Sequence, residues 1–493
     1  MPIHGTMRII RKLLVALGVF ILVLFVLGLW FARGHPTDKP ISATEGMDVA
    51  LVKPKPETFP TIAIASAVGW AAGEAPKPAP GLVVNRFAEG LSHPRTMLTL
   101  PNGDVLVTET DHPPSTGNSG GGVMGAIQRF FWRRAGAGTA SPNTIALLRD
   151  GDGNGSAEQR FTLRKQDLDS PSGMAFGEGK LYVANHNAVL AFDYKPGDTA
   201  VTGEAKKIAD LPASGNHWMR NLLLSEDGKM LYVAIGSASN IGENGMDIEK
   251  GRAAIYEITL ANGRMRQFAG GLRNPNGMDW NPATGELWTV VNERDQLGGD
   301  LVPDYLSNVP IGVNYGWPWY YWKDKLDERV DAPIPEFLGE YVRRPEFALG
   351  AHTAPLGLRF AAKGNRMGDQ FASGAFIARH GSWNRKPPSG YDVVFVKFDA
   401  NGNPLGMPVP VLTGFLTDKG TTRGRPVWIS FDQGGALLVS DDTAGIIWRV
   451  MAPGAAASAG TKALQTGNIP PRRSLDGALD AQFRRQAEDL RGN

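Results

Sequence analysis

The residues best suited to chemistry begin with His217, one of only eight histidines, in the segment GNHWMRN. An asparagine and a tryptophan flank it, Arg220 follows in the same segment, and then comes an apolar run with a Gly-containing turn, LLLSEDGKMLYVAIGS. Histidine changes charge near neutral pH and is therefore suited to acid–base work. His217 is either a base that faces a substrate or a core histidine near a charge, and its surroundings must decide.

Arginines stand at two similar places in the chain. GLRNPNG puts Arg273 and Asn274 at the start of an expected strand, and TTRGRP puts Arg423 and Arg425 one residue apart. The planar guanidinium group suits carboxylates. Residues i and i+2 of an extended segment point to the same side. The pair therefore predicts a polyanionic ligand between the two side chains, and a structural arginine pair is the alternative.

Two further segments allow two interpretations each. LLRDGDGNGSAE holds Asp150, Asp152 and Asn154 at alternate positions, which is typical of the start of a calcium loop or of an Asp-Gly hairpin turn. The Gly-rich insertion 113–143 has the basic and aromatic centre IQRFFWRR. It is expected either to cap a site or rest on a membrane, or to be a surface loop.

The elements that position these residues are hairpins. Six segments join a polar or small opening, an apolar strand, a Gly-containing turn and a second strand. They begin at His93, Ser170, Met219, Asn274, Ala354 and Gly424. This recurrence predicts an all-β fold, a six-bladed β-propeller, and a pair of β-sandwiches would not explain it.

Equivalent loops of successive blades face the same end of a propeller, where ligand sites are expected. The hairpin openings should therefore meet at one mouth of the channel. They contain Arg95, Ser172, His217, Arg273, Asn274, Thr353, Arg423 and Arg425.

Composition limits the class of protein. The chain has 493 residues, 61 glycines, a net charge of +2 and no cysteine. These values indicate a globular, turn-rich protein. They exclude disulfides and thiolate metal sites and argue against nucleic acid as a partner.

The N-terminus predicts a membrane anchor. Arg8, Arg11 and Lys12 precede an uncharged run from Leu13 to Ala32, which is long enough to span a bilayer as a helix. The basic flank places the body on the periplasmic side of the inner membrane, and a long cleaved signal peptide is the alternative. The expected parts are a cytoplasmic start and transmembrane anchor (1–34), a tether and first strand (35–80), the propeller (81–452) and a linker with a tail helix (453–493).

Several motifs, taken in order, resemble the PQQ-dependent sugar dehydrogenases over residues 80–452. They are GNHWMRN…LYVAIGS, LRNPNG, NERD…GGD…DY…NYGWP, TAPLGL and RGRP…SDDTAGIIWRV. They are most similar to the L-sorbosone and aldose dehydrogenase group of the soluble glucose dehydrogenase family. The resemblance implies a six-bladed propeller with pyrroloquinoline quinone (PQQ), a tricarboxylate ortho-quinone, as cofactor. It also implies oxidation of an aldose or sugar-derived aldehyde, with a membrane quinone or a cytochrome as electron acceptor.

The resemblance also implies residue roles. His217 would be the general base that takes the hydroxyl proton, and Arg273 would polarise the quinone carbonyl. The family's lysine in the fifth blade has no counterpart in FIARHGSWNRK, where Arg379, His380 or Arg385 could replace it. The cofactor-binding residues would be Arg273, Asn274, Thr353, His380, Arg423 and Arg425.

Proteins of this family bind calcium beside the cofactor, and the matching segment here is ERDQLGGDLVPDY. The resemblance implies ligands from the backbone carbonyls near Asp295 and Gln296 and from the carboxylates of Asp300 and Asp304, since calcium takes oxygen ligands. The family's small and proline residues are replaced by Asp295 and Gln296, and two residues are inserted before Asp304.

Two other function classes stay open. A calcium-dependent propeller lactonase would use Asn292, Glu293 and Asp300, but would leave the paired arginines without a purpose. A non-enzymatic binding propeller would keep only the scaffold, and the presence of His217 argues against it. The aromatic run YGWPWYYW would either stack on a sugar ring or belong to the core.

Overall fold

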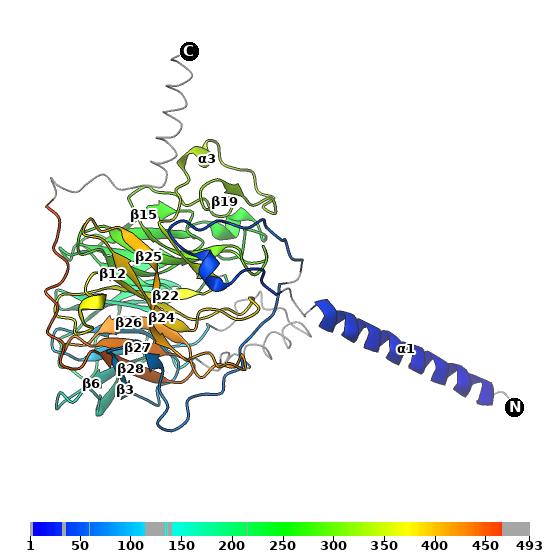
Figure 1. Cartoon of the computed structure of the whole chain (residues 1–493), viewed down its shortest axis with the longest axis horizontal. Helices are drawn as coiled ribbons and strands as arrows, with labels where there is room; N and C mark the ends of the chain where they lie inside the picture. The colour runs from blue at the N-terminus through cyan, green and yellow to red at the C-terminus, as the bar shows by residue number, and fades with distance from the viewer. Residues whose placement is uncertain are drawn as a thin grey trace, which may run out of the picture.

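The structure, a computed structural model, describes residues 3–31, 36–58, 60–113, 134, 136, 141–213 and 215–465. Six antiparallel sheets of at least four strands each form blades, as a propeller requires (Figure 1). Blade 1 has β4 (Pro94–Thr99), β5 (Val105–Glu109), β6 (Thr144–Arg149) and β7 (Gln159–Arg164), and blade 2 has β8 (Gly173–Gly177), β9 (Lys180–Ala184), β10 (Ala188–Asp193) and β11 (Lys206–Asp210).

The remaining blades repeat the pattern. Blade 3 has β12 (Leu222–Leu224), β13 (Met230–Ile235), β14 (Ala254–Thr259) and β15 (Arg264–Gly270), and blade 4 has β16 (Asn274–Trp280), β17 (Leu287–Asn292), β18 (Pro303–Asn308) and β21 (Phe347–Ala351). Blade 5 has β22 (Pro355–Phe360), β23 (Gly374–Arg379), β24 (Asp392–Phe398) and β25 (Pro404–Thr413), and blade 6 has β26 (Pro426–Phe431), β27 (Leu437–Asp441), β28 (Ile446–Met451) and β3 (Val83–Ala88). The first two strands of each blade are the predicted hairpins, so the six-bladed propeller is confirmed.

The ring closes through strands from opposite ends of the propeller. β3 comes before blade 1 in the chain but pairs with β28, with Val84 opposite Val450, and Figure 1 shows these two strands side by side. The innermost strands β4, β8, β12, β16, β22 and β26 contact one another in sequence, and β26 contacts β4. Hairpin openings far apart in the chain therefore lie around one axis.

The core lies between neighbouring blades. The second strands are buried along nearly their whole length, as in β5 and β17, because each blade is covered on both faces. Trp288 and Phe347 of blade 4, for example, pack with Phe360 and Ile377 of blade 5. Fully covered strands read as continuous apolar runs, which is why LYVA and LWTVV recur.

The N-terminal segment adds to the outer edges of two blades. η1 (Ile41–Thr44) leads into β1 (Glu45–Gly46), which pairs with β21, and β2 (Lys77–Pro78) pairs with β25. The remaining short elements are β19 (Tyr320–Tyr321), β20 (Lys325–Leu326), α3 (Leu338–Tyr341), η2 (Met246–Glu249) and η3 (Asp369–Phe371).

The expected membrane anchor is not supported. The N-terminal residues form the helix α1 (Ile3–Phe31), which projects from the β-sheet body in Figure 1. Within the described parts of the chain, however, no helix has the combined length and apolar character that a membrane crossing requires. The predicted tail helix and nearly all of the insertion 113–143 lie outside the described residues.

Candidate active site

The hairpin openings meet at one mouth of the ring, as predicted. Hydrogen bonds join neighbouring blades there, from Arg220 N to Ser172 Oγ (2.7 Å), from Ser237 N to Arg273 O (2.7 Å), from Asn292 Nδ2 to Pro355 O (2.7 Å) and from Ser440 Oγ to Arg95 O (2.8 Å). Each bond starts or ends at an innermost strand or at the loop before it. The positions of the polar side chains at this mouth are therefore fixed by the blades themselves.

His217 is held in one tautomer. Its Nδ1 lies 2.9 Å from Ser237 O and 3.0 Å from Ser237 Oγ. A carbonyl oxygen only accepts, so Nδ1 of the neutral ring carries the hydrogen and Nε2 carries the lone pair. Among the described residues Nε2 has no hydrogen-bond partner. Burial, and then repulsion from Arg273, lowers the pKa of His217 to about 3, so at neutral pH the ring is uncharged and Nε2 keeps its lone pair.

Close backbone packing places this histidine. Gly215 has a φ of +112°, and a Cβ there would lie 2.5 Å from the Cα of Ala238. A Cβ on Gly236 would lie 2.6 Å from the Cβ of His217 and 2.3 Å from Asn274 Oδ1. Arg220 Nη1 donates to the carbonyl of His217 at 2.8 Å. The two glycines therefore let His217 and Asn274 approach each other at the mouth.

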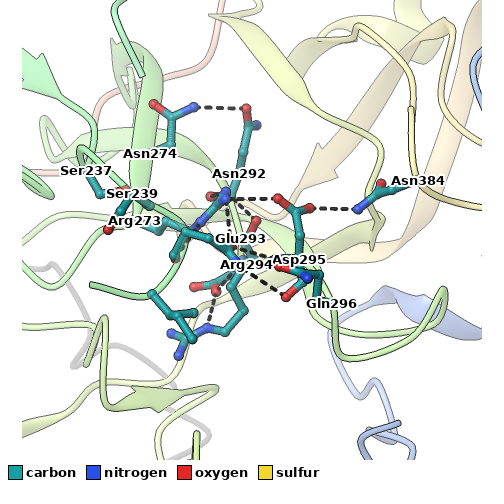
Figure 2. Close-up of polar contacts among 12 residues, drawn as sticks. Ser237, Ser239, Arg273, Asn274, Asn292, Glu293, Arg294, Asp295, Gln296 and Asn384 are labelled. Atoms are coloured by element: carbon teal, nitrogen blue, oxygen red, sulfur yellow. Dashed lines mark hydrogen bonds and ion pairs between the residues drawn. The ribbon is translucent and has the colours of Figure 1, made fainter. Parts of the chain in front are cut away.

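Arg273 lies close to His217, but its donors are used within the protein. Nε donates to Asn240 O (3.1 Å), Nη1 to Glu293 O (2.6 Å), and Nη2 to Asn240 Oδ1 (2.9 Å) and to Asp295 Oδ2 (3.0 Å). Figure 2 shows Arg273 at the centre of these contacts. Burial alone would raise the pKa of Asp295, but Arg273, followed by His352 and Asn384, holds it below its usual range. Arg273 is thus a buried, paired cation.

Asn274 and Thr353 are both bonded within the protein. Asn274 Nδ2 donates to Asn292 Oδ1 at 3.2 Å, as Figure 2 shows. Thr353 is fully buried, and its hydroxyl donates to Leu349 O at 3.1 Å. Of the two, only Asn274 keeps part of its side chain close to His217.

A second charged cluster at the mouth joins His380 and Arg425 to Arg95 and Asp442. Asp442 is bonded to Arg95 Nη1 and lies 3.1 Å from His380 Nε2. Burial opposes its ionisation, but His380, Arg95 and Arg425 together hold the pKa of Asp442 below its usual range. Burial, aided by the two arginines, lowers the pKa of His380. The cluster therefore contains two guanidinium groups and one carboxylate.

These two arginines retain unused donors. The Nε atoms of Arg95 and Arg425 are buried and have no hydrogen-bond partner among the described residues. Among the described residues, the Arg425 side chain donates a hydrogen bond only through Nη2, to the hydroxyl of Tyr391 at 3.2 Å. Arg95 lies over the ring of Trp218 at 5.3 Å. The sequence places Arg95 at the mouth, at the opening of blade 1, but gave it no role as a site residue. Asp442 was not predicted at all.

The paired-arginine prediction fails for Arg423. Its Nε lies 3.3 Å from Glu74 Oε2, Nη1 donates to Gly414 O at 3.2 Å, and its guanidinium lies over Trp70. Arg425 points instead toward Tyr391 and Asp442. The residues between 423 and 426 precede β26 and are not a regular strand, so the rule for i and i+2 does not apply. No anion site lies between the two side chains.

The other two candidates for the family's lysine are structural. Arg379 is buried between Asp392 and Glu45. Arg385 donates to Gly299 O at 3.0 Å and to Asp300 Oδ1 at 3.2 Å. Of the three, only His380 joins the charged cluster at the mouth.

The four expected calcium ligands are all bonded to groups of the chain itself. Asp300 Oδ2 accepts from the backbone N–H groups of Asp38 (2.8 Å) and Lys39 (3.2 Å), so it anchors the N-terminal segment. Asp304 accepts from the backbone N–H groups of Glu293 (2.7 Å) and Ala354 (2.8 Å), and burial raises its pKa to about 7. The carbonyls of Asp295 and Gln296 accept from Arg329, at 2.9 and 3.0 Å. Each of these oxygen groups already has a partner in the chain.

The DGDGN segment forms a turn. Asp150 accepts from the backbone N–H groups of Gly153 and Gly155, at 2.8 Å each. Asp150, Asp152 and Glu158 form the one cluster of three acidic or histidine side chains with metal-ligand spacing in the described part of the chain. They lie on the β6–β7 hairpin, and these contacts are those of the turn.

The aromatic run YGWPWYYW belongs mainly to the core. Tyr315, Trp317, Tyr321 and Trp322 are each at most 4% exposed, and Tyr315 stacks on Tyr305 at 5.7 Å. The expectation of a sugar-stacking platform is therefore not supported for these four rings.

Comparisons with known proteins agree with the fold and point to a chemistry. A family model described as TrAA12-like matches residues 142–308 and 338–453, more than half of the chain. A PQQ-dependent sugar dehydrogenase of Hypocrea jecorina is 27% identical over 55% of this chain and 71% of that protein, and an uncharacterised protein of Borreliella burgdorferi is 27% identical over 63% and 85%. The calcium structure of the Trichoderma reesei family AA12 protein is 21% identical, with a TM-score of 0.61 over 77% of this chain and 97% of that one. The relatives whose activity is named are PQQ-dependent or aldose sugar dehydrogenases.

Proposed function

Since this chain belongs to the TrAA12-like family, we propose that it is a PQQ-dependent oxidoreductase that oxidises an aldose or a sugar-derived aldehyde, such as an L-sorbosone-like compound. The observation that carries this proposal is the position of His217. Ser237 holds its Nδ1, so Nε2 carries the lone pair, and the buried cation Arg273 acts on the ring. A base beside fixed positive charge suits proton removal next to a polyanionic cofactor.

Two arginines at the mouth support a tricarboxylate quinone as the ligand. Arg95 and Arg425 carry buried N–H groups without partners among the described residues, and unpartnered buried donors are costly unless a ligand satisfies them. These two arginines, with His380 beside them, would bind carboxylates of the cofactor. Arg273 would act through its charge, because its N–H groups are already bonded. Asn274 would offer a nearby amide, and Thr353 would support the backbone.

The proposed roles of the protein's own groups follow from these contacts. When bound, PQQ would supply the two-electron oxidant that takes the hydride from the carbon bearing the reacting hydroxyl. His217 Nε2 would accept the hydroxyl proton, while Ser237 keeps Nδ1 protonated. Arg273 would disfavour charge on the free imidazole, and thus keep the base neutral before substrate binds. Trp218, next to the base and under Arg95, would limit water at one side.

The acceptor and the location belong to the same proposal. Electrons would pass to a membrane quinone or a cytochrome, and the body would work on the periplasmic side of the inner membrane. The named activities of the relatives support a sugar as substrate and leave the acceptor as a prediction.

A role for calcium has weaker support than a role for PQQ. The Trichoderma reesei family AA12 protein has a calcium structure, but the expected ligands of this chain are bonded to its own groups, so no step is assigned to a metal. The lactonase alternative meets the same obstacle. Asn292 donates to Pro355 O (2.7 Å), Glu293 bonds Arg294 (3.0 Å), and Asp300 holds residues 38 and 39.

A dye-reduction assay tests the proposal. The full chain is stripped with chelator, supplied with PQQ with or without Ca²⁺, and offered a panel of aldoses and L-sorbosone. We expect turnover with at least one sugar and none without PQQ. Sugar-independent dye reduction, or no turnover and no spectrum of bound quinone, would contradict the proposal.

A further inference from the structure

One cationic side chain lies where a calcium ion would be expected. Arg329 Nη1 donates to the carbonyl oxygens of both Asp295 (2.9 Å) and Gln296 (3.0 Å). These two carbonyls lie in the loop between β17 and β18, and they are the ones that the family resemblance assigns to the metal. A guanidinium nitrogen bridging two adjacent carbonyls makes the kind of contact that a bound cation makes.

Arg329 is firmly held in this place. Its Nε and Nη2 donate to the two carboxylate oxygens of Asp327, at 2.8 and 2.7 Å. The Asp327 carboxylate is fully buried and also lies 3.3 Å from Arg294 Nη1. Burial opposes its ionisation, but Arg329 and Arg294 hold the pKa of Asp327 below its usual range. Such a two-point pair fixes the orientation of the guanidinium group.

The surrounding oxygen atoms do not form a metal shell. Calcium takes six to eight oxygen ligands. Asp304 and Asp300 accept backbone N–H groups, and Asp295 is paired with Arg273 and Asn384, as Figure 2 shows. A divalent ion bound to the two carbonyls would also lie next to the fixed charge of Arg329, and like charges at such distances repel strongly.

We propose that Arg329 takes the place of the metal ion in this chain. Its guanidinium bonds the loop of Asp295 and Gln296 and supplies positive charge beside the cofactor site, which makes cofactor binding independent of calcium. The residue comes from the segment after β20 (Lys325–Leu326) and reaches the loop between β17 and β18 of blade 4. This inference rests on the proposed function for the identity of the cofactor, and on the contacts of Arg329 for the exclusion of the metal.

Metal and cofactor titrations test it on the full chain. PQQ binding is followed by absorbance in EDTA and in millimolar CaCl₂, for wild type and Arg329→Gln. We expect the same Kd in both buffers for wild type. For Arg329→Gln we expect binding in EDTA to be weaker by roughly tenfold, the loss for one charged hydrogen-bonding group, with recovery in Ca²⁺. A wild-type Kd that Ca²⁺ lowers tenfold, or a variant equal to wild type in both buffers, would overturn the proposal.

Two controls separate the effect of Arg329 from Ca²⁺ binding elsewhere in the chain and from a loss of folding. Asp152→Asn is introduced into both proteins, because the acidic turn at Asp150, Asp152 and Glu158 could bind Ca²⁺ by itself. Arg329→Lys keeps the charge but loses the two-point pair with Asp327, so its PQQ affinity in EDTA should lie between those of wild type and Arg329→Gln. If Arg329→Gln does not fold, the gain of PQQ affinity that Ca²⁺ gives to Arg329→Lys tests the proposal instead. If wild type binds no PQQ at all, the proposed function fails. The metal proposal is then judged by the melting temperature, which Ca²⁺ should raise in Arg329→Gln and leave unchanged in wild type.

Discussion

Hydrogen-bond donors that the protein leaves unused divide the arginines of the mouth into two kinds. Arg273 spends its N–H groups on Asn240, Glu293 and Asp295. Arg95 and Arg425 keep buried N–H groups without partners among the described residues. At the scale of single residues, the second kind is suited to bind an anionic cofactor, while the first shapes the electrostatic environment of the base.

The two neighbouring arginines of TTRGRP provide a matched test. Arg425→Gln should weaken PQQ binding by roughly tenfold to a hundredfold, the range for a lost charged hydrogen bond. Arg423→Gln should leave it within about threefold, because Arg423 bonds Glu74 and Gly414 away from the mouth. Fluorescence or absorbance titration with PQQ measures both. Equal losses in the two variants would show that Arg425 has no special role.

The pH profile tests the state of His217. A general base works while it is neutral, and the neutral fraction is lost as the pH falls through the pKa of the folded protein. Because that pKa is lowered to about 3, kcat/KM for a slow sugar should stay flat from pH 8 down to roughly pH 5, below the pKa of an ordinary histidine. An acid limb with a midpoint near pH 6.5 that disappears in His217→Gln would contradict the expected environment.

At the scale of elements, a short helix supports the base from behind. Glu249 on η2 accepts from Ala238 N (2.7 Å) and from the hydroxyl of Ser239. The Ser237 hydroxyl donates to Ser239 O at 2.6 Å, and Ser237 holds the imidazole of His217. Burial raises the pKa of Glu249. Glu249 of η2 therefore holds residues 238 and 239 in place, and Ser237 beside them orients the imidazole of His217.

Glu249→Ala should therefore lower kcat more than it changes KM. The loss of both acceptor atoms leaves two buried donors unpaired, which costs roughly 1–3 kcal/mol each, and a displaced base slows the reaction by roughly tenfold to a hundredfold. Glu249→Gln, which keeps one oxygen, should recover part of the rate. The matched control Asp247→Asn on the same helix is exposed and pairs only with Lys250 among the described residues. If Glu249→Ala and Asp247→Asn have the same steady-state kinetics and melting temperature, η2 has no such role.

At the scale of the whole molecule, ring closure depends on β3. Its pairing with β28 completes blade 6, and Phe87 of this strand is buried. A variant that starts at residue 90 loses this strand, whereas one that starts at residue 81 keeps it. The variant that starts at residue 90 should have a Tm lower by roughly 10 °C or more than the variant that starts at residue 81, because it loses a buried phenylalanine and an edge strand. Calorimetry measures the Tm of both variants, with a variant that starts at residue 36 as the reference. Equal Tm values for the starts at residues 81 and 90 would mean that the ring closes without β3.

Much of this architecture could be predicted from the sequence because it rests on local patterns. Each hairpin has its own apolar run and turn glycine, such as Gly228 with a φ of +71°, so the blade number follows from counting. The position of His217 at a blade opening follows for the same reason. Side-chain partners depend on segments far apart in the chain and could not be predicted. Asp300 was expected to bind a metal, but it bonds residues 38 and 39.

The same limit explains the error at Arg423 and the omission of Asp442. Whether Arg423 faces its neighbour or Glu74 depends on a segment from the start of the chain. Asp442 follows β27 with no motif of its own, and its importance appears only when Arg95 and His380 are brought beside it. Cofactor binding must therefore be judged from the assembled ring.

The most direct measurement of the central claim is a single-turnover experiment on the PQQ-loaded full chain. Protein and sugar are mixed without an external acceptor, and the absorbance of the bound quinone is followed for wild type, His217→Gln and the control His186→Gln, a buried histidine of blade 2. We predict a rapid spectral change with at least one aldose or with L-sorbosone, slowed roughly a hundredfold or more in His217→Gln only. No change with any sugar, or the same rate in wild type and His217→Gln, would contradict the account.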